Sequence, residues 1–331
     1  MADLIPRPSG RGGERGQLLL IAAFIVAVSF VALALVVNSA IFTENLATRD
    51  DVAGSEDALD HRHEVEQSVE ETINEINQNN TILDDYSTVN LDTPVRENVE
   101  RIARQTGLQQ SAQGRVVDIE YLGWVQGIKV AQDDQRTFTN ESGEQDWLVM
   151  DTVSDTRRMR FNLTALPSAD LTASPFEMDV YDGVDEWNLR IAEDSAISGD
   201  VVVEVDRPGE PPETCTSEFD GFLVIDVTAG TIGGEPCHAL TRLTDGTPMW
   251  FASGVGPGYE IEFNNGHRIE GKYSFVVDAG ALEGDSRNFG SPGSGPYTKD
   301  AVYSATVLYQ YHTEDVGYET PVRVVPGRLP P

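Results

Sequence analysis

Val116-Val117-Asp118-Ile119-Glu120-Tyr121 is the stretch that decides the fold, because from here onward the polar and apolar side chains alternate. A period of two places alternate side chains on opposite faces and predicts a β-strand. The same alternation returns at 158–163, 201–205, 273–277 and 303–311. No run after residue 110 has a helical period, so the strands cannot be joined by regular crossover helices, and we predict an antiparallel sheet.

Turn residues separate these strands. Asn264-Asn265-Gly266 predicts a hairpin between the strands 259–263 and 268–277. Three prolines and one glycine cluster at 207–213. Here the β-rich region either divides into two domains or forms one large sandwich with a proline-rich loop.

Upstream of the strands the period changes to that of a helix. Val65, Val69, Ile73, Ile76 and Leu83 fall on one helical face of an acidic segment, which we interpret as an amphipathic stalk. Its apolar stripe packs either on its own domain or on a partner subunit. A second helix is predicted after it.

That second helix has clear start and stop signals. Thr93 is a suitable N-cap, Pro94 fits the first helical position, and Gly107 is a suitable end.

An apolar run occupies residues 18–37, where Ser29 is the single polar side chain. Twenty helical residues rise about 30 Å, which matches the hydrocarbon core of a bilayer. Arginines precede the run and carboxylates dominate after it, so the positive-inside rule places the N-terminus in the cytoplasm and the rest outside the cell membrane. The lipid bilayer is thus the first expected partner.

Arg15-Gly16-Gln17 stands directly before the apolar run, behind a short leader that carries arginines. This arrangement resembles the class III signal of type IV pilins and pilin-like proteins, in particular those of haloarchaea. The resemblance implies that a prepilin-type peptidase cuts between Gly16 and Gln17, and that the apolar helix then contacts other pilin or pilin-like subunits. Taken without the resemblance, the same residues indicate a plain single-pass anchor.

The predicted fold class is therefore α+β. An N-terminal transmembrane helix continues into an amphipathic helix, and an antiparallel β-rich, sandwich-like exterior domain follows. The predicted domains are a cytoplasmic leader at 1–16, a transmembrane helix at 17–38, a helical stalk at 39–112 and the exterior domain at 113–331, with a subdivision considered near 207–213.

The charge balance of the chain argues against partners that are themselves strongly negative. Its 331 residues carry a formal net charge of −32, and only three of the basic residues are lysine. Such a surface repels phosphate backbones, which argues against nucleic-acid binding. Acidity with scarce lysine is typical of a protein that stays soluble in concentrated salt, although an ordinary acidic surface is the alternative.

Cys215 and Cys237 are the only cysteines, and both fall in the part assigned to the exterior. In an oxidising compartment such a pair predicts a disulfide. Two free buried thiols are the alternative.

Sequons at Asn79, Asn140 and Asn162 permit N-glycosylation on an exterior surface. No spacing of histidine, cysteine or carboxylate side chains selects a catalytic, cofactor or metal site. We therefore expect no cofactor and no enzymatic activity, and interpret the chain as a membrane-anchored, pilin-like surface protein with a structural or adhesive role, as a minor pilin or filament-assembly subunit. A membrane-tethered exterior enzyme or ligand-binding module is the alternative.

Overall fold

A computed structural model describes residues 33, 56–78, 91–241, 252–314 and 316–327. The chain forms two compact units. The smaller unit comprises residues 1–61 and 312–318; within its described part, residues 56–61 are helical and a turn is closed between Thr313 and Val316. The larger unit comprises residues 62–311 and 319–331 and contains almost all of the described strands.

Helical residues 62–78 open the larger unit, and helix α2 (Asp92–Ser111) follows. The remaining described elements are strands, with two short 3₁₀ turns (η2 and η3) among them. In chain order they are β1 (Val116–Thr137), β2 (Trp147–Val153), β3 (Thr156–Leu163), β4 (Phe176–Tyr181), β5 (Glu186–Glu193), β6 (Asp200–Asp206), β7 (Glu213–Glu218), β8 (Leu223–Asp226), β9 (Thr231–Ile232), β10 (Glu235–Pro236), β11 (Tyr259–Asn264), η2 (Gly266–Arg268), β12 (Glu270–Asp278), β13 (Leu282–Glu283), η3 (Ser286–Asn288), β14 (Tyr297–His312) and β15 (Gly317–Val324).

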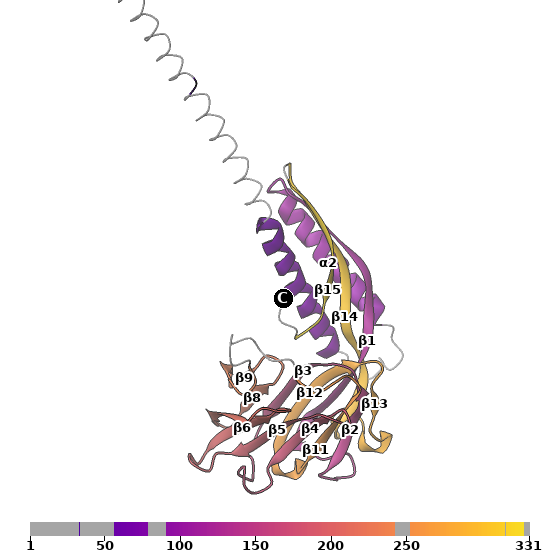
Figure 1. Cartoon of the computed structure of the whole chain (residues 1–331). Coiled ribbons are helices and arrows are strands. Elements are labelled where there is room, and N and C mark those ends of the chain that lie inside the picture. Colours follow the sequence, from indigo (N-terminus) through magenta and orange to yellow (C-terminus); the bar gives the residue numbers. More distant parts are fainter. Residues whose placement is uncertain (1–32, 34–55, 79–90, 242–251, 315, 328–331) are drawn as a thin grey trace, which may run out of the picture. The chain divides into compact units, whose positions relative to one another are not determined.

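These strands form two sheets, which Figure 1 shows in the sandwich region of the larger unit. One has eight strands in the order β10-β9-β8-β3-β12-β1-β14-β15, and the other has seven in the order β13-β2-β11-β4-β5-β6-β7. The registers given for β1, β3, β4, β11 and β12 are all antiparallel, as the alternation in the sequence predicts.

Aromatic side chains join the two sheets into a sandwich-like fold. Phe161 of β3 and Tyr273 of β12 come from the eight-stranded sheet, whereas Phe176 of β4 and Phe263 of β11 come from the other. Their ring centroids lie 5.9 Å apart for Phe161–Phe176 and 5.2 Å for Phe263–Tyr273. All four side chains are buried, so the core lies between the sheets.

The fold-class prediction is wrong in its α+β form. The described chain is mainly antiparallel β, and its helical residues are few by comparison. None of the helices among the described residues has the length and apolar character to cross a membrane. The apolar run 18–37 on which the transmembrane prediction depended lies outside the described residues, apart from Leu33.

The predicted hairpin at Asn264-Asn265-Gly266 is also wrong. β11 pairs with β2 and β4, whereas β12 pairs with β1 and β3, so the turn carries the chain from one sheet to the other. Asn265 adopts a left-handed conformation (φ 55°), and the 3₁₀ turn that follows redirects the backbone. The proline-rich segment 207–213 joins β6 to β7, which are neighbours in one sheet.

Both helices pack within the larger unit through the apolar faces that the sequence predicts. Val65, Val69 and Ile73 are buried, so this stripe is covered by its own chain. Helix α2 packs on β1 and continues past the predicted end at Gly107. A Cβ at Gly107 would lie 3.4 Å from the Val117 carbonyl oxygen, an ordinary van der Waals contact, so this glycine lies where the helix faces the strand and does not end the helix.

Candidate functional site

Three of the residues predicted for processing or glycosylation, Gly16, Gln17 and Asn79, lie outside the described residues. Cys215 and Cys237 form a disulfide, with their Cα atoms 5.8 Å apart. It joins β7, the last strand of the seven-stranded sheet, to the segment after β10, the last strand of the other sheet. The predicted disulfide is therefore present, and it links the two sheets covalently near their edge strands β7 and β10.

The two described sequon asparagines differ in their surroundings. Asn140 is buried, its Nδ2 donates to Glu144 Oε2 and Asn288 Oδ1, and its Oδ1 accepts from the Glu144 backbone N–H at 2.8 Å. Its amide thus has a structural role in the folded chain. Asn162 is half-buried in β3, opposite Lys272 of β12.

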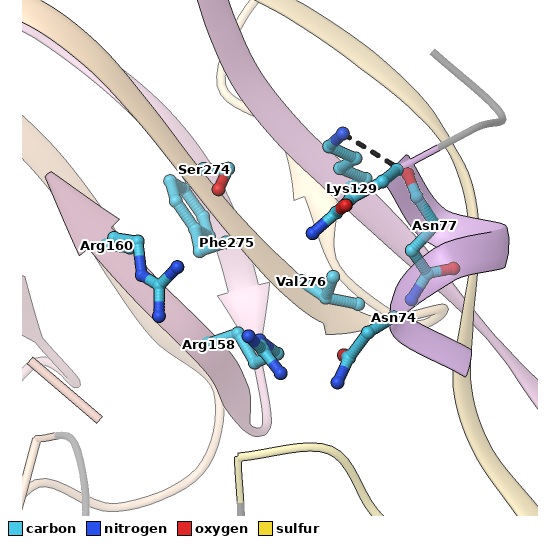
Figure 2. A pocket seen from close by; sticks show the side chains of 9 residues that line it. Asn74, Asn77, Lys129, Arg158, Arg160, Ser274, Phe275 and Val276 are labelled. Carbon is cyan, nitrogen blue, oxygen red and sulfur yellow. Dashed lines mark hydrogen bonds between the residues drawn. The ribbon is translucent and has the colours of Figure 1, made fainter. Parts of the chain in front are cut away.

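A small hollow lies where helical residues 62–78 meet the eight-stranded sheet, and Figure 2 shows it from close by. Its volume is about 70 Å³. The helix contributes three amides, β1 one lysine, β3 two arginines and β12 a short backbone segment. The lining residues are Asn74, Asn77, Gln78, Lys129, Arg158, Arg160, Ser274, Phe275 and Val276.

The helix is held at the hollow by specific contacts. The Asn77 side chain donates to the Val302 carbonyl at 2.9 Å and accepts from the Val302 N–H at 2.8 Å. About two turns earlier, Glu70 Oε1 accepts from the Gly327 N–H at 2.9 Å. The helix end is therefore bound to backbone from the C-terminal part of the chain, and the wall that it supplies is fixed in place.

A β-bulge in β3 sets the position of Arg158. Arg157 pairs with Val276 and Arg160 pairs with Ser274, so two residues of β3 stand opposite Phe275 alone. The backbone of Arg158 has φ 52°, a left-handed conformation that residues other than glycine rarely adopt. Because such strain persists only where the surroundings enforce it, the bulge is a built feature of the hollow.

The cationic side chains of the hollow are partly compensated by carboxylates. Arg160 donates through Nε and Nη2 to Asp226 Oδ2, at 3.1 and 2.7 Å. Arg158 Nη1 lies 3.8 Å from Glu70 Oε1, which is an ion pair beyond hydrogen-bond length. Lys129 Nζ donates to the Asn77 carbonyl oxygen at 3.2 Å.

Burial and like charges act on these cations in the same direction. Burial lowers the pKa of Arg158, and the neighbouring Arg160 lowers this pKa further. Burial also lowers the pKa of Lys129, against the opposing effect of Asp133. The hollow therefore holds positive charge that is incompletely solvated, which is the condition under which an anion gains most from binding.

This site has no continuous motif in the sequence. Its residues come from four segments far apart in the chain, and the sequence alone does not bring these segments together. One signal was available: Arg157-Arg158-Met159-Arg160 places three arginines within four residues of a chain that has only 23 basic residues. In so acidic a protein, that clustering marks a place where positive charge is kept.

Part of the chain is similar to a known protein family. Residues 12–141 match a family described as a family of unknown function, DUF7261, and this segment is less than half of the chain. It includes α2, β1 and the helical wall of the hollow, whereas the arginines of β3 lie beyond it. No curated protein and no solved structure matches the chain.

Proposed function

We propose that this chain is a pilin-like surface protein of a salt-adapted, haloarchaeal cell, attached to the cell membrane by its apolar segment 18–37 and displaying its β-rich part outside. Its role in this proposal is structural or adhesive. The structural observation that carries the proposal is the disulfide between Cys215 and Cys237, because disulfides persist in oxidising, extracytoplasmic spaces. The arginine asymmetry around segment 18–37 supports the same orientation.

The sandwich supports display better than turnover of a substrate. Its interior is filled by packed aromatic and aliphatic side chains. The hollow beside the helix, at about 70 Å³, is small compared with ligand pockets, which commonly measure about 300 to 1,000 Å³. A rigid, well-filled domain presents a defined outer surface, which is what a surface subunit requires.

The orientation is tested by adding protease to intact cells and following the C-terminal part by immunoblot. We expect the chain to fractionate with membranes and its β-rich part to be degraded from outside. Protection of this part, with a cytoplasmic marker equally protected, would overturn the proposed orientation.

The pilin-like character is tested separately, at the N-terminus. A prepilin-type peptidase acting on Arg15-Gly16-Gln17 leaves a mature chain that begins at Gln17, so intact-mass measurement should show the loss of residues 1–16. A Gly16→Leu variant should retain them, since a bulky side chain replaces the small residue at the cut. A wild-type chain that retains its leader would reduce the protein to a plain anchor.

Filament membership needs one further measurement. As a minor pilin, the mature chain should co-purify with filaments sheared from the cell surface; as an assembly subunit, it should stay in the membrane fraction and its deletion should reduce filament number. Normal filaments in the deletion strain, with no chain in them, would contradict both roles.

A second candidate function is a membrane-tethered ligand-binding module. The observation that favours it is the cationic hollow, where Arg158, Arg160 and Lys129 gather in a chain with a formal net charge of −32. This candidate does not require filament assembly, and a deletion strain with normal filaments leaves it in place.

A further inference from the structure

We propose that the hollow between helical residues 62–78 and the eight-stranded sheet binds a small oxyanion, such as a sulfate ion or a carboxylate group. This site goes beyond the surface role proposed above and does not depend on it. Its charge, the geometry of Arg158 and its size suit the hollow to such an ion.

Charge is the first step. The whole chain has a formal net charge of −32, so a randomly chosen small patch of its surface is expected to be negative. Three cations (Lys129, Arg158 and Arg160) line the hollow and none of its lining residues is a carboxylate, although Glu70 and Asp226 each form an ion pair with one of the two arginines. An anion is therefore attracted here and repelled elsewhere.

The geometry of Arg158 is the second step. Within the described residues its guanidinium makes the 3.8 Å ion pair with Glu70 and no hydrogen bond, although a guanidinium has five N–H donors. Glu70 is already engaged, because the same oxygen accepts the Gly327 N–H. A Cβ at Gly327 would lie 2.9 Å from Arg158 Cγ, so the backbone there packs closely against the arginine stem in a space that only glycine leaves open.

The opposite wall supplies neutral donors. Figure 2 shows Asn74 reaching toward the hollow from the helix while Arg158 reaches toward it from β3. An asparagine amide can turn its NH₂ group toward an anion, whereas a carboxylate at this place would exclude one. A planar guanidinium facing an amide donor matches the separated oxygen atoms of a carboxylate or sulfate.

Size is the last step. A water molecule needs about 10 to 15 Å³ by the same measure, so a volume of about 70 Å³ holds several non-hydrogen atoms. The ligand is therefore a small ion, or the charged end of a larger molecule that remains outside.

The experiment measures the binding of radiolabelled sulfate to the purified full-length chain by equilibrium dialysis, at constant ionic strength in sodium chloride. We expect one saturable site per chain. Asn74→Asp places a negative charge in the wall without changing the shape of the side chain, and should weaken sulfate binding at least about tenfold. Arg158→Gln removes the guanidinium and should do the same.

Two control variants match these substitutions in chemistry and burial. Asn98→Asp repeats the isosteric change on α2, where Asn98 is also half-buried. Arg190→Gln removes a half-buried arginine of β5 that forms ion pairs with Glu177 and Glu204. All three residues belong to the seven-stranded sheet, which does not line the hollow. Both should bind sulfate as the wild type does.

Circular dichroism on each variant separates binding from folding. The melting temperature of Asn74→Asp should be no lower than that of the wild type, because the new carboxylate can pair with Arg158. If Arg158→Gln fails to fold, the binding measurement on Asn74→Asp decides the test. Competition by unlabelled acetate and phosphate identifies which oxyanion fits best. Absence of saturable binding of all three anions to the wild type, or equal binding by the wild type and Asn74→Asp, would overturn the site.

Discussion

The side chain of Asn77 and the backbone of Val302 exchange two hydrogen bonds, as two neighbouring strands would. Nδ2 donates to the carbonyl oxygen at 2.9 Å, and the Val302 N–H donates to Oδ1 at 2.8 Å. Both residues are buried. The amide therefore completes the hydrogen bonding of β14 at a point where helix and sheet meet.

Asn77→Ala should be strongly destabilising, because it leaves both backbone groups of Val302 buried without partners. We expect a loss of about 2 to 4 kcal/mol in the free energy of unfolding, measured by urea denaturation. Asn98→Ala also removes two hydrogen bonds of an asparagine amide on α2, the one that it donates to the Pro94 carbonyl and the one that it accepts from Arg101, but at a more exposed place. It is the matched control and should cost less than about 1 kcal/mol. Equal losses in the two variants would show that the Asn77 pair contributes nothing special.

Asp179 should make stability depend on pH. Burial, followed by the charges of Glu177, Glu186 and Glu262, raises the pKa of Asp179 to about 7. The folded chain thus binds this proton more tightly than the unfolded chain, so the contribution of Asp179 to stability is greatest below its ordinary pKa near 4 and is lost as the pH rises through about 7.

Asp179→Asn should remove that pH dependence and stabilise the chain at pH 8 by about 1 to 2 kcal/mol, after allowance for solvent screening of a partly exposed group. The measurement is the melting temperature between pH 4 and pH 8. Asp182→Asn is the control of opposite sign, because backbone N–H groups of Asp185, Gly256 and Val184 lower the pKa of Asp182. A pH profile unchanged in Asp179→Asn would refute the assignment.

The disulfide should contribute measurably to stability. Cys215 and Cys237 are 22 residues apart, and closing a loop of that length is worth about 3 kcal/mol in the chain-entropy estimate. A Cys215→Ala, Cys237→Ala double variant should unfold at lower urea concentration by a corresponding amount, and added reductant should affect only the wild type. Alkylation of two thiols in the untreated wild type would contradict the bond.

Gly271 should tolerate no side chain. It lies in β12 between β1 and β3, with φ 156°, and a Cβ there would lie 2.1 Å from the Asn162 carbonyl oxygen. Gly271→Ala should cost about 3 kcal/mol or more, since backbone on a central strand would have to move. Gly293→Ala, with φ 81° and open space around the Cβ, isolates the conformational strain alone and should cost about 1 to 2 kcal/mol.

The strands were predictable because the alternation of polar and apolar side chains depends only on neighbouring residues in the sequence. In β3, Met159 and Phe161 point into the core while Arg158 and Arg160 lie on the other face, which is the alternation that the sequence displays. The turn at Asn265 was read correctly as a turn, yet local chemistry does not specify which sheet the next strand joins. That choice is made by core packing between residues distant in the chain.

The candidate site was beyond prediction for the same reason. Asn74, Lys129, Arg158 and Ser274 line one hollow, although some 200 positions separate the first from the last. No spacing rule connects them, and the bulge that aims Arg158 has no signature in the sequence. The same applies to the end of α2, where Gly107 predicts a stop but the helix continues to Ser111.

The pairing of Asn77 with Val302 also constrains the order of events during synthesis. The two residues are 225 positions apart, and Glu70 and Gly327 are 257 apart. These hydrogen bonds of the first helix therefore cannot form until nearly the whole chain has been made. During this interval the helix lacks these contacts and is more exposed to aggregation or to a chaperone, so a premature stop that removes Val302 and Gly327 should destabilise a helix at the opposite end of the sequence.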